Sequence, residues 1–276
     1  MAKPNIRKLS IFHDYYSRLK NISMSVFEWE GLPDTCNPRF LEKCLFEYGQ
    51  AIFVNDSDFG FLNLKATVAD AINLYEEPTA YRAYSIGYGE KIFSRDECVF
   101  VRNNYLCKST DFTALIYAEK LAKIDLAMQT NINAQKTPLL LRCDQKTKST
   151  LEAIYNIYEG DKPVIFGHKA LQENPIEAIV TGAPFVADKL REEKIAVWNE
   201  FHEFLGINTN PSDKKKERLI VSEVDSNNEQ IEMQGETMLL CRQDACKKAN
   251  ELFGWNCSVK FRVNKGGSVE GGVVNG

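Results

Sequence analysis

The stretch P-F-V-A-D-K-L-R-E-E-K-I-A-V-W-N-E-F-H-E-F-L-G (184–206) has the pattern of a long amphipathic helix. Proline suits a first helical turn, glycine suits the residue just past a last turn, and this length of helix spans about 30 Å. At 100° per residue the apolar side chains gather on one face, namely Val186, Leu190, Val197, Trp198, Phe201, Phe204 and Leu205. The opposite face is charged and carries Asp188, Lys189, Glu192, Glu193, Glu200 and Glu203.

The segment that follows, 207–235, is long, polar and without clear periodicity, so we expect a loop. Compact domains rarely contain so long a connection unless it is functional or disordered. Its first part is basic (Lys214, Lys215, Lys216 and Arg218) and its second part is acidic. A solvated turn would explain the lysine run by composition alone, whereas contact with a polyanion is the functional alternative.

The composition describes a folded protein that does not bind nucleic acid through its overall charge. The chain has 276 residues, 44% of them hydrophobic and 26% charged, with a formal net charge of −4. A ring of identical chains would turn each lysine into a circle of positive charge, and the acidic helix face would then line a passage that repels DNA.

No residue pattern supports catalysis, a cofactor or a metal site. The sequence lacks a phosphate-binding G-x-x-x-x-G-K-[ST] loop, a G-x-S-x-G elbow and an H-E-x-x-H pair. The eight cysteines form no C-x-x-C pair, so we expect free thiols in a reducing compartment rather than a metal site or disulfides. No apolar run is long enough for a membrane span.

Two further long helices are predicted. The first covers Ser10–Trp29 with Ser10 as its cap, and the second covers Asp111–Lys136 and is apolar nearly all round at its start. A shorter helix follows the Asn37–Pro38 cap and ends at Gly49. We expect Met238–Phe253 to be the last helix.

Between these helices the sequence predicts mixed or β-rich modules. Short apolar runs at 51–54, 90–93 and 99–101 predict strands in 49–110. Within 138–183, strands at 139–143 and 164–166 flank a short helix at 151–158. The segment 257–263 alternates like a strand, and the glycine-rich end is expected to be mobile.

Several unusual runs make the chain similar to the portal proteins, or upper collar and head–tail connector proteins, of small short-tailed, protein-primed phages of the Salas type. The matching runs include F-E-W-E-G-L-P (27–33), N-A-Q-K-T-P (133–138), Y-E-G-D-K-P-V-I-F-G-H (158–168), A-P-F-V-A-D-K-L (183–190) and N-N-E-Q-I-E (227–232). They occur in the order of that family.

The resemblance implies an α+β portal fold assembled as a cyclic twelve-fold ring at one capsid vertex. Three stem helices would be 10–29 (within 1–48), 111–137 and 184–206. A small SH3-like or α/β clip would be 138–183, and a mixed α/β wing would comprise 49–110 with 236–276. The channel loop would be 207–235, and Lys189, Lys215 and Lys216 match positions that form lysine rings in the family.

The resemblance also implies partners and a location. The ring would contact double-stranded DNA in its channel, the major capsid protein, a packaging ATPase, and then a lower collar or tail protein. It would be assembled in the host cytoplasm and carried in the virion. We expect no cofactor and no enzymatic activity in this chain, because packaging chemistry would belong to the ATPase.

Three departures limit what the resemblance predicts. Val180 occupies a position that can be lysine in the family, which removes one candidate lysine ring. The N-terminus carries only Lys3, Arg7 and Lys8, too little basic charge to predict a packaging RNA. The short glycine-rich end gives no basis for a helical crown. Two alternatives stay open: a collar or tail protein that never lines a DNA path, and a metal or redox enzyme built on the cysteines.

Overall fold

The computed structural model describes residues 6–69, 72–85, 87–135, 139–143, 164–168, 176–178, 184–207 and 221–262. The chain divides into two compact units, and each is described separately. The smaller comprises Met1–Phe12 and Glu119–Trp198, and the larger comprises His13–Ala118 and Asn199–Gly276. Helices and strands are mixed in both, as the α+β prediction requires.

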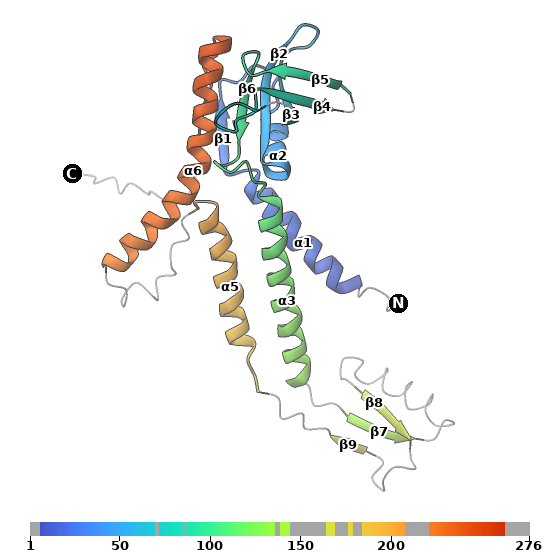
Figure 1. Cartoon of the computed structure of the whole chain (residues 1–276). Coiled ribbons are helices and arrows are strands. Elements are labelled where there is room, and N and C mark those ends of the chain that lie inside the picture. The colour runs from blue at the N-terminus through green and yellow to red at the C-terminus, as the bar shows by residue number, and fades with distance from the viewer. Residues whose placement is uncertain are drawn as a thin grey trace, which may run out of the picture. The chain divides into compact units, whose positions relative to one another are not determined.

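The larger unit is built on an antiparallel sheet of five strands in the order β5-β4-β3-β2-β6 (Figure 1). The strands are β2 (Gln50–Asp56), β3 (Gly60–Val68), β4 (Ala80–Ser85), β5 (Gly89–Ser94) and β6 (Cys98–Arg102). β2, β5 and β6 lie where short apolar runs predicted strands.

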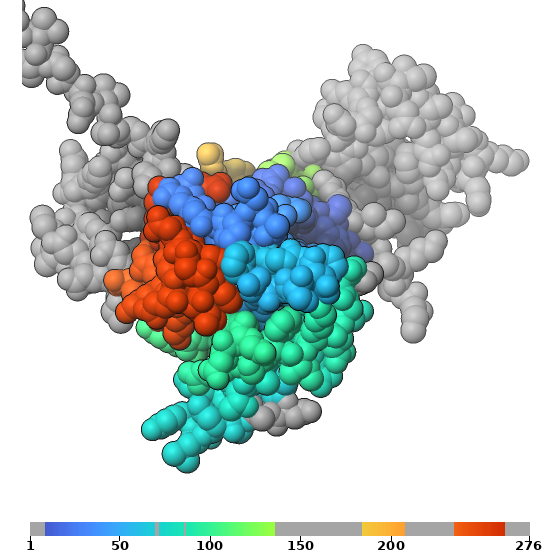
Figure 2. Space-filling view, turned by 90° about the horizontal axis from the view of Figure 1, so that it is seen from above, coloured from blue at the N-terminus to red at the C-terminus, as the bar shows by residue number. Residues whose placement is uncertain are grey.

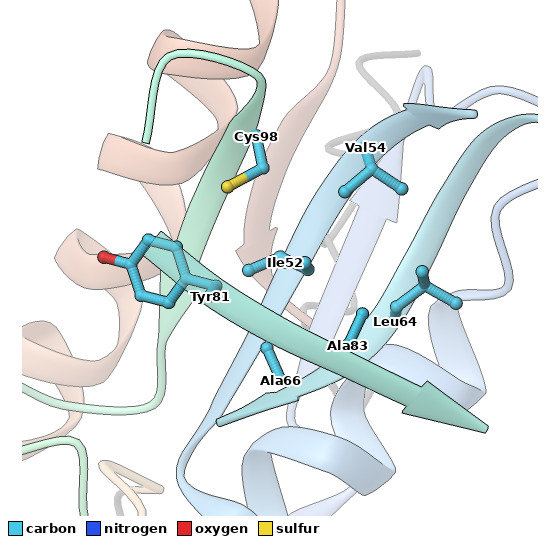
Figure 3. Packing of buried hydrophobic residues seen from close by; sticks show 7 residues of the cluster. All are labelled: Ile52, Val54, Leu64, Ala66, Tyr81, Ala83 and Cys98. Atoms are coloured by element: carbon cyan, nitrogen blue, oxygen red, sulfur yellow. The ribbon is translucent and has the colours of Figure 1, made fainter. Parts of the chain in front are cut away.

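This sheet is strongly coiled. β4 and β6 are separated by β3 and β2, so a flat sheet would hold them about 14 Å apart. Instead, Tyr81 of β4 and Phe100 of β6 stack with ring centroids 4.6 Å apart. The coiling lets one face of the sheet bury Ile52, Val54 and Ala83 against each other, and Figure 3 shows β4 crossing over β2 and β3.

A second, two-stranded sheet and a long helix cover the other face. β1 (Phe27–Glu30) pairs antiparallel with β10 (Ser258–Phe261), and α6 (Val221–Phe253) lies against β10 and β6 (Figure 1). Phe53 of β2 packs between Trp29 and Trp255, with ring centroids 6.0 and 5.2 Å away.

The helix α2 (Pro38–Tyr48) confirms its predicted caps. The Asn37 side chain accepts a hydrogen bond from the Phe40 N–H at 3.0 Å, and Pro38 occupies the first turn. Gly49 ends the helix with φ +76°, where a Cβ would collide with the carbonyl oxygen of Cys107.

The first stem helix was predicted too long. α1 is Ile6–Ser23, so Ser10 lies inside the helix rather than capping it, and Phe27–Glu30 is a strand. The segment leaves the helix because Trp29 lies opposite Val259 in the β1–β10 ladder. The two strands lie far apart in the sequence, so the periodicity of either segment alone cannot reveal that they pair.

The last helix was predicted too short. α6 begins at Val221, so residues 221–235 of the expected channel loop are helical instead of irregular. A sustained apolar period begins only near Met238, which explains why the sequence pattern placed the helix start there. Residues 208–220 of the expected loop lie outside the described residues.

The smaller unit contains parts of three helices, α1, α3 and α5, and a three-stranded sheet. α3 (Asp111–Gln135) agrees with the prediction for 111–136, and it contributes its part from Glu119. β7 (Leu139–Cys143) pairs parallel with β8 (Val164–His168) and antiparallel with β9 (Ile176–Ala178). The strands at 139–143 and 164–166 are confirmed, β9 was not predicted, and residues 151–158 lie outside the described part.

Candidate functional site

The helix that opened the sequence argument is α5 (Ala187–Phe204), and its polar face is exposed. In the smaller unit, Asp188, Lys189, Glu192 and Glu193 are all exposed, while Ala187 and Val197 are buried. Lys189 and Arg191 are exposed beside these three carboxylates, so this part of the face carries both signs of charge. Such a surface repels a polyanion at its carboxylates and attracts it at the two basic side chains.

Two polar contacts fix the start of α5 against α3 within the smaller unit. The Asn131 amide donates to the carbonyl of Pro184 at 2.8 Å and accepts from the Val186 N–H at 2.9 Å. Lys194 pairs with Asp125 at 2.7 Å. Because Asn131 satisfies the residues before Ala187, the helix begins there and not at Pro184 as predicted.

The C-terminal turn of α5 is anchored in the larger unit. Phe201 is fully buried, Leu205 is nearly so, and the Phe201 ring lies 5.3 Å from that of Tyr117. Glu200 is exposed and accepts a hydrogen bond from Tyr117, and burial together with this carboxylate raises the pKa of the Tyr117 phenol. The apolar face predicted for 184–206 is thus confirmed at this end.

The expected channel loop leaves α5 where two glycines touch. Gly206 ends the helix with φ +78°, and a Cβ there would lie 2.5 Å from the Cα of Gly235 in α6. A Cβ on Gly235 would in turn lie 2.5 Å from the Cα of Gly206. The backbones of Gly206 and Gly235 are therefore in direct contact, so the two ends of the segment 207–234 lie next to each other.

Of the residues predicted to contact DNA, only Lys189 falls in the described part of the chain. Lys214, Lys215, Lys216 and Arg218 lie outside the described residues. The structure therefore gives the surroundings of the helix that leads to them and not of the lysines themselves.

A buried ion pair that the sequence analysis missed holds α6 to the rest of the larger unit. Arg242 is 2% exposed, and its guanidinium lies 4.0 Å above the Phe27 ring. It donates to both oxygens of Glu42 at 2.9 and 2.8 Å, and further N–H groups reach Met238 and Asn103. The only signal in the sequence was a basic residue within an otherwise apolar helix face.

Most cysteines in the described ranges are buried thiols of raised pKa, and the exception is Cys257, whose pKa is lowered by its hydrogen bond with the Cys246 thiol. Seven are free thiols and six of these are buried, and burial raises the pKa of Cys36 to about 11 and of Cys44 and Cys98 to about 12. No group of metal-ligating side chains occurs in the described ranges. Nor does any helix there combine the length and hydrophobicity that a membrane span requires.

Solved structures with a similar course of the chain come from phages and related particles. The portal and tail of native bacteriophage P68 match at 14% identity and TM-score 0.47, over 96% of this chain and 92% of that one. A HK97 family portal protein from Corynebacterium diphtheriae matches at 10% and 0.45, over 95% and 96%. The virion of a native gene transfer agent matches at 9% and 0.49, over 94% and 84%.

The match to a protein family is of a different kind, because it extends over nearly the whole sequence. The family model described as Phage Connector (GP10) matches residues 2–265. That range includes every element from α1 to β10, and with it both the acidic face of α5 and the Arg242 cluster. By this match, the chain belongs to the Phage Connector (GP10) family.

Proposed function

We propose that this connector protein is the portal subunit of a short-tailed phage, and that twelve copies form a ring through which double-stranded DNA enters and leaves the head. Membership of the connector family makes the chain a phage portal component of the virion. The ring number, the DNA path and the partners named below are the proposed part.

The exposed charge on α5 carries the proposal. In a ring with this face inward, the exposed carboxylates of Asp188, Glu192 and Glu193 would form a wall around the DNA together with the exposed basic side chains of Lys189 and Arg191. Such a wall limits phosphate contact, so DNA can slide, because each neutralised phosphate adds to affinity. Lys189, together with Lys214, Lys215, Lys216 and Arg218, would supply the few basic contacts that retain a packaged genome.

Exposed apolar side chains on α3, on α5 and just before α5 support assembly with further copies. In the larger unit, Phe112 and Ile116 of α3 are 69% and 42% exposed. In the smaller unit, Phe185 and Ile195 are 61% and 51% exposed. Apolar side chains of this size are stabilised when a neighbouring subunit covers them.

The proposed partners follow from this role. The major capsid protein would surround the ring, a packaging ATPase would dock during filling, and a lower collar or tail protein would replace it afterwards. ATP hydrolysis would occur in the ATPase, so we assign no enzymatic step to this chain.

Replacement of the loop lysines tests the DNA path. We expect Lys214, Lys215 and Lys216 changed together to alanine to leave the ring intact by electron microscopy, while packaged DNA leaks from filled heads. Lys108→Ala, an exposed lysine of the larger unit, is the matched control. Normal genome retention in the triple variant would favour the second candidate, a collar protein that never lines the DNA path. A strictly monomeric particle at high concentration would exclude the ring.

A further inference from the structure

The most exposed apolar side chains in the described part of the chain lie together on a short segment before β4. Leu74 is 91% exposed and Tyr75 is 80% exposed, and Ile72 beside them is 62% exposed. The segment 72–79, in teal, projects from the surface of the larger unit (Figure 2). Adjacent side chains of this size are costly to leave in water, so a partner that covers them would be stabilised.

This projection is held in one conformation. The Asn73 side chain accepts hydrogen bonds from the N–H groups of Tyr75 and Glu77, both at 2.9 Å. Glu77 then pairs with Arg95 at 2.6 Å, which ties the segment to the β5–β6 turn. Glu76 has φ +59°, a conformation that non-glycine residues seldom adopt. These contacts restrain the backbone that carries the two apolar side chains, and such a restraint lowers the entropy lost on binding.

A pocket of about 630 Å³ adjoins the projection. Glu76, Glu77 and Pro78 form one side of it, so it is continuous with Leu74 and Tyr75. Its base is the Tyr81–Phe100 stack that closes the coiled sheet. Opposite, Tyr105 and Leu252 line the pocket and are themselves 57% and 47% exposed. A side chain of a partner could enter here while Leu74 and Tyr75 contact the same partner.

The surroundings of the projection are acidic. Glu76, Asp96 and Glu97 are exposed beside it, and the basic residue between them, Arg95, is already paired with Glu77. The lining of the pocket is mixed, because it carries Arg95, Arg102 and Lys248 as well as Glu76, Glu77, Asp96 and Glu251. A segment that binds to both the projection and the pocket would need an apolar side chain with lysine or arginine next to it. The exposed carboxylates of the projection would repel a nucleic acid.

A neighbouring copy in a ring would have to meet this surface with a different part of its own surface. The projection and the pocket adjoin on one side, so a single partner would cover both. The chain has a formal net charge of −4, so a second copy offers less of the positive charge that an acidic projection favours than a basic segment of another protein does.

We propose that residues 72–77 and the adjoining pocket form a docking site for a basic, apolar segment of a different virion protein. The inference rests on the proposed portal role for the statement that the partner belongs to the virion. The docking surface itself rests on the contacts described above.

Binding to short overlapping peptides, drawn from the other structural proteins of the same phage, tests the site. We expect the full-length protein to bind peptides that carry an aliphatic or aromatic residue beside lysine or arginine. Leu74→Ser with Tyr75→Ser should weaken that binding about thirtyfold, as expected when a central apolar anchor is lost. Glu76→Gln with Asp96→Asn should weaken it less and make it less sensitive to salt. Ile92→Ser, 57% exposed on β5 and outside the patch, is the control.

Mass photometry of the same variants separates this inference from the portal proposal. An unchanged ring mass with lost peptide binding supports the docking site. A smaller ring mass in the Leu74/Tyr75 variant would mean that the surface joins copies of this chain, and the inference would be wrong. Binding that is equal in all variants, or absent from the unmodified protein, would also overturn it. If the unmodified protein forms no ring, the portal proposal fails while the peptide result still decides the docking site.

Discussion

Replacement of Arg242 by methionine should strongly destabilise the larger unit. Methionine keeps much of the side-chain volume but removes the guanidinium, whose N–H groups make five hydrogen bonds of 2.8–3.2 Å. Glu42, which is 3% exposed, would keep only the Trp29 indole N–H as a described side-chain donor. Leaving one member of a buried ion pair unpaired costs about 3–5 kcal/mol.

A double variant separates the charge effect from the packing effect. In Glu42→Leu with Arg242→Met no charge is left buried, so the loss is limited to neutral hydrogen bonds of about 1 kcal/mol each. We therefore expect the double variant to lose no more stability than Arg242→Met alone. The two single changes should be strongly non-additive, since the side chains are in contact.

Urea unfolding at one fixed protein concentration, followed by tryptophan fluorescence, measures these differences. Trp29 and Trp255 both lie in the larger unit and report on it. Arg242→Lys is a useful third variant, because an ammonium keeps the charge but lacks the planar pair of donors that meets both oxygens of Glu42. The reasoning is refuted if Arg242→Met loses less than about 1 kcal/mol, or if the two single effects simply add in the double variant.

Three more predictions concern single positions. Gly206→Ala or Gly235→Ala should lower the melting temperature. The added methyl group would lie 2.5 Å from the other backbone, and overpacking of this kind costs about 1–3 kcal/mol, which exceeds the gain of at most about 1 kcal/mol from alanine in a helix. Phe201→Ala should lower the free energy of unfolding by about 3–5 kcal/mol in thermal or urea unfolding, because the aromatic side chain is fully buried. Trp198 is only half-buried, so Trp198→Ala should lose assembly of the oligomer, seen by microscopy, before it loses secondary structure. Hydrogen bonds from Lys91 and Tyr88 hold the pKa of the Asp56 carboxyl well below its usual range. The ionised carboxylate therefore contributes fully to folding stability above about pH 5, and this contribution is lost as the pH falls. Asp56→Asn should accordingly flatten the curve of melting temperature against pH between about pH 5 and 2.

The sequence predicted best where the determinants were local. Asn37, Pro38 and Gly49 mark both ends of α2 because caps depend only on neighbouring residues. The burial of Val197, Phe201 and Leu205 followed from helical spacing alone.

Features that depend on distant partners were missed. Trp29 was assigned to a helix because its strand partner Val259 lies far along the chain. The buried role of Arg242 was not predicted because its partner Glu42 lies far away in the sequence. The start of α6 was predicted too late because its first turns carry no continuous apolar stripe. At the candidate site the polarity of α5 was predicted, whereas the contact between Gly206 and Gly235 depends on two helices meeting in space.

The pairing of β1 with β10 has a consequence for biosynthesis. Phe27–Glu30 leave the ribosome early, but their partner strand, Ser258–Phe261, is among the last described segments to emerge. Such long-range pairing forms slowly, and here it cannot form before Ser258–Phe261 have been synthesised. A chain terminated before Arg242 would thus lack both this strand pair and the arginine that α6 supplies. The fold itself would then keep unfinished chains from being built into a particle.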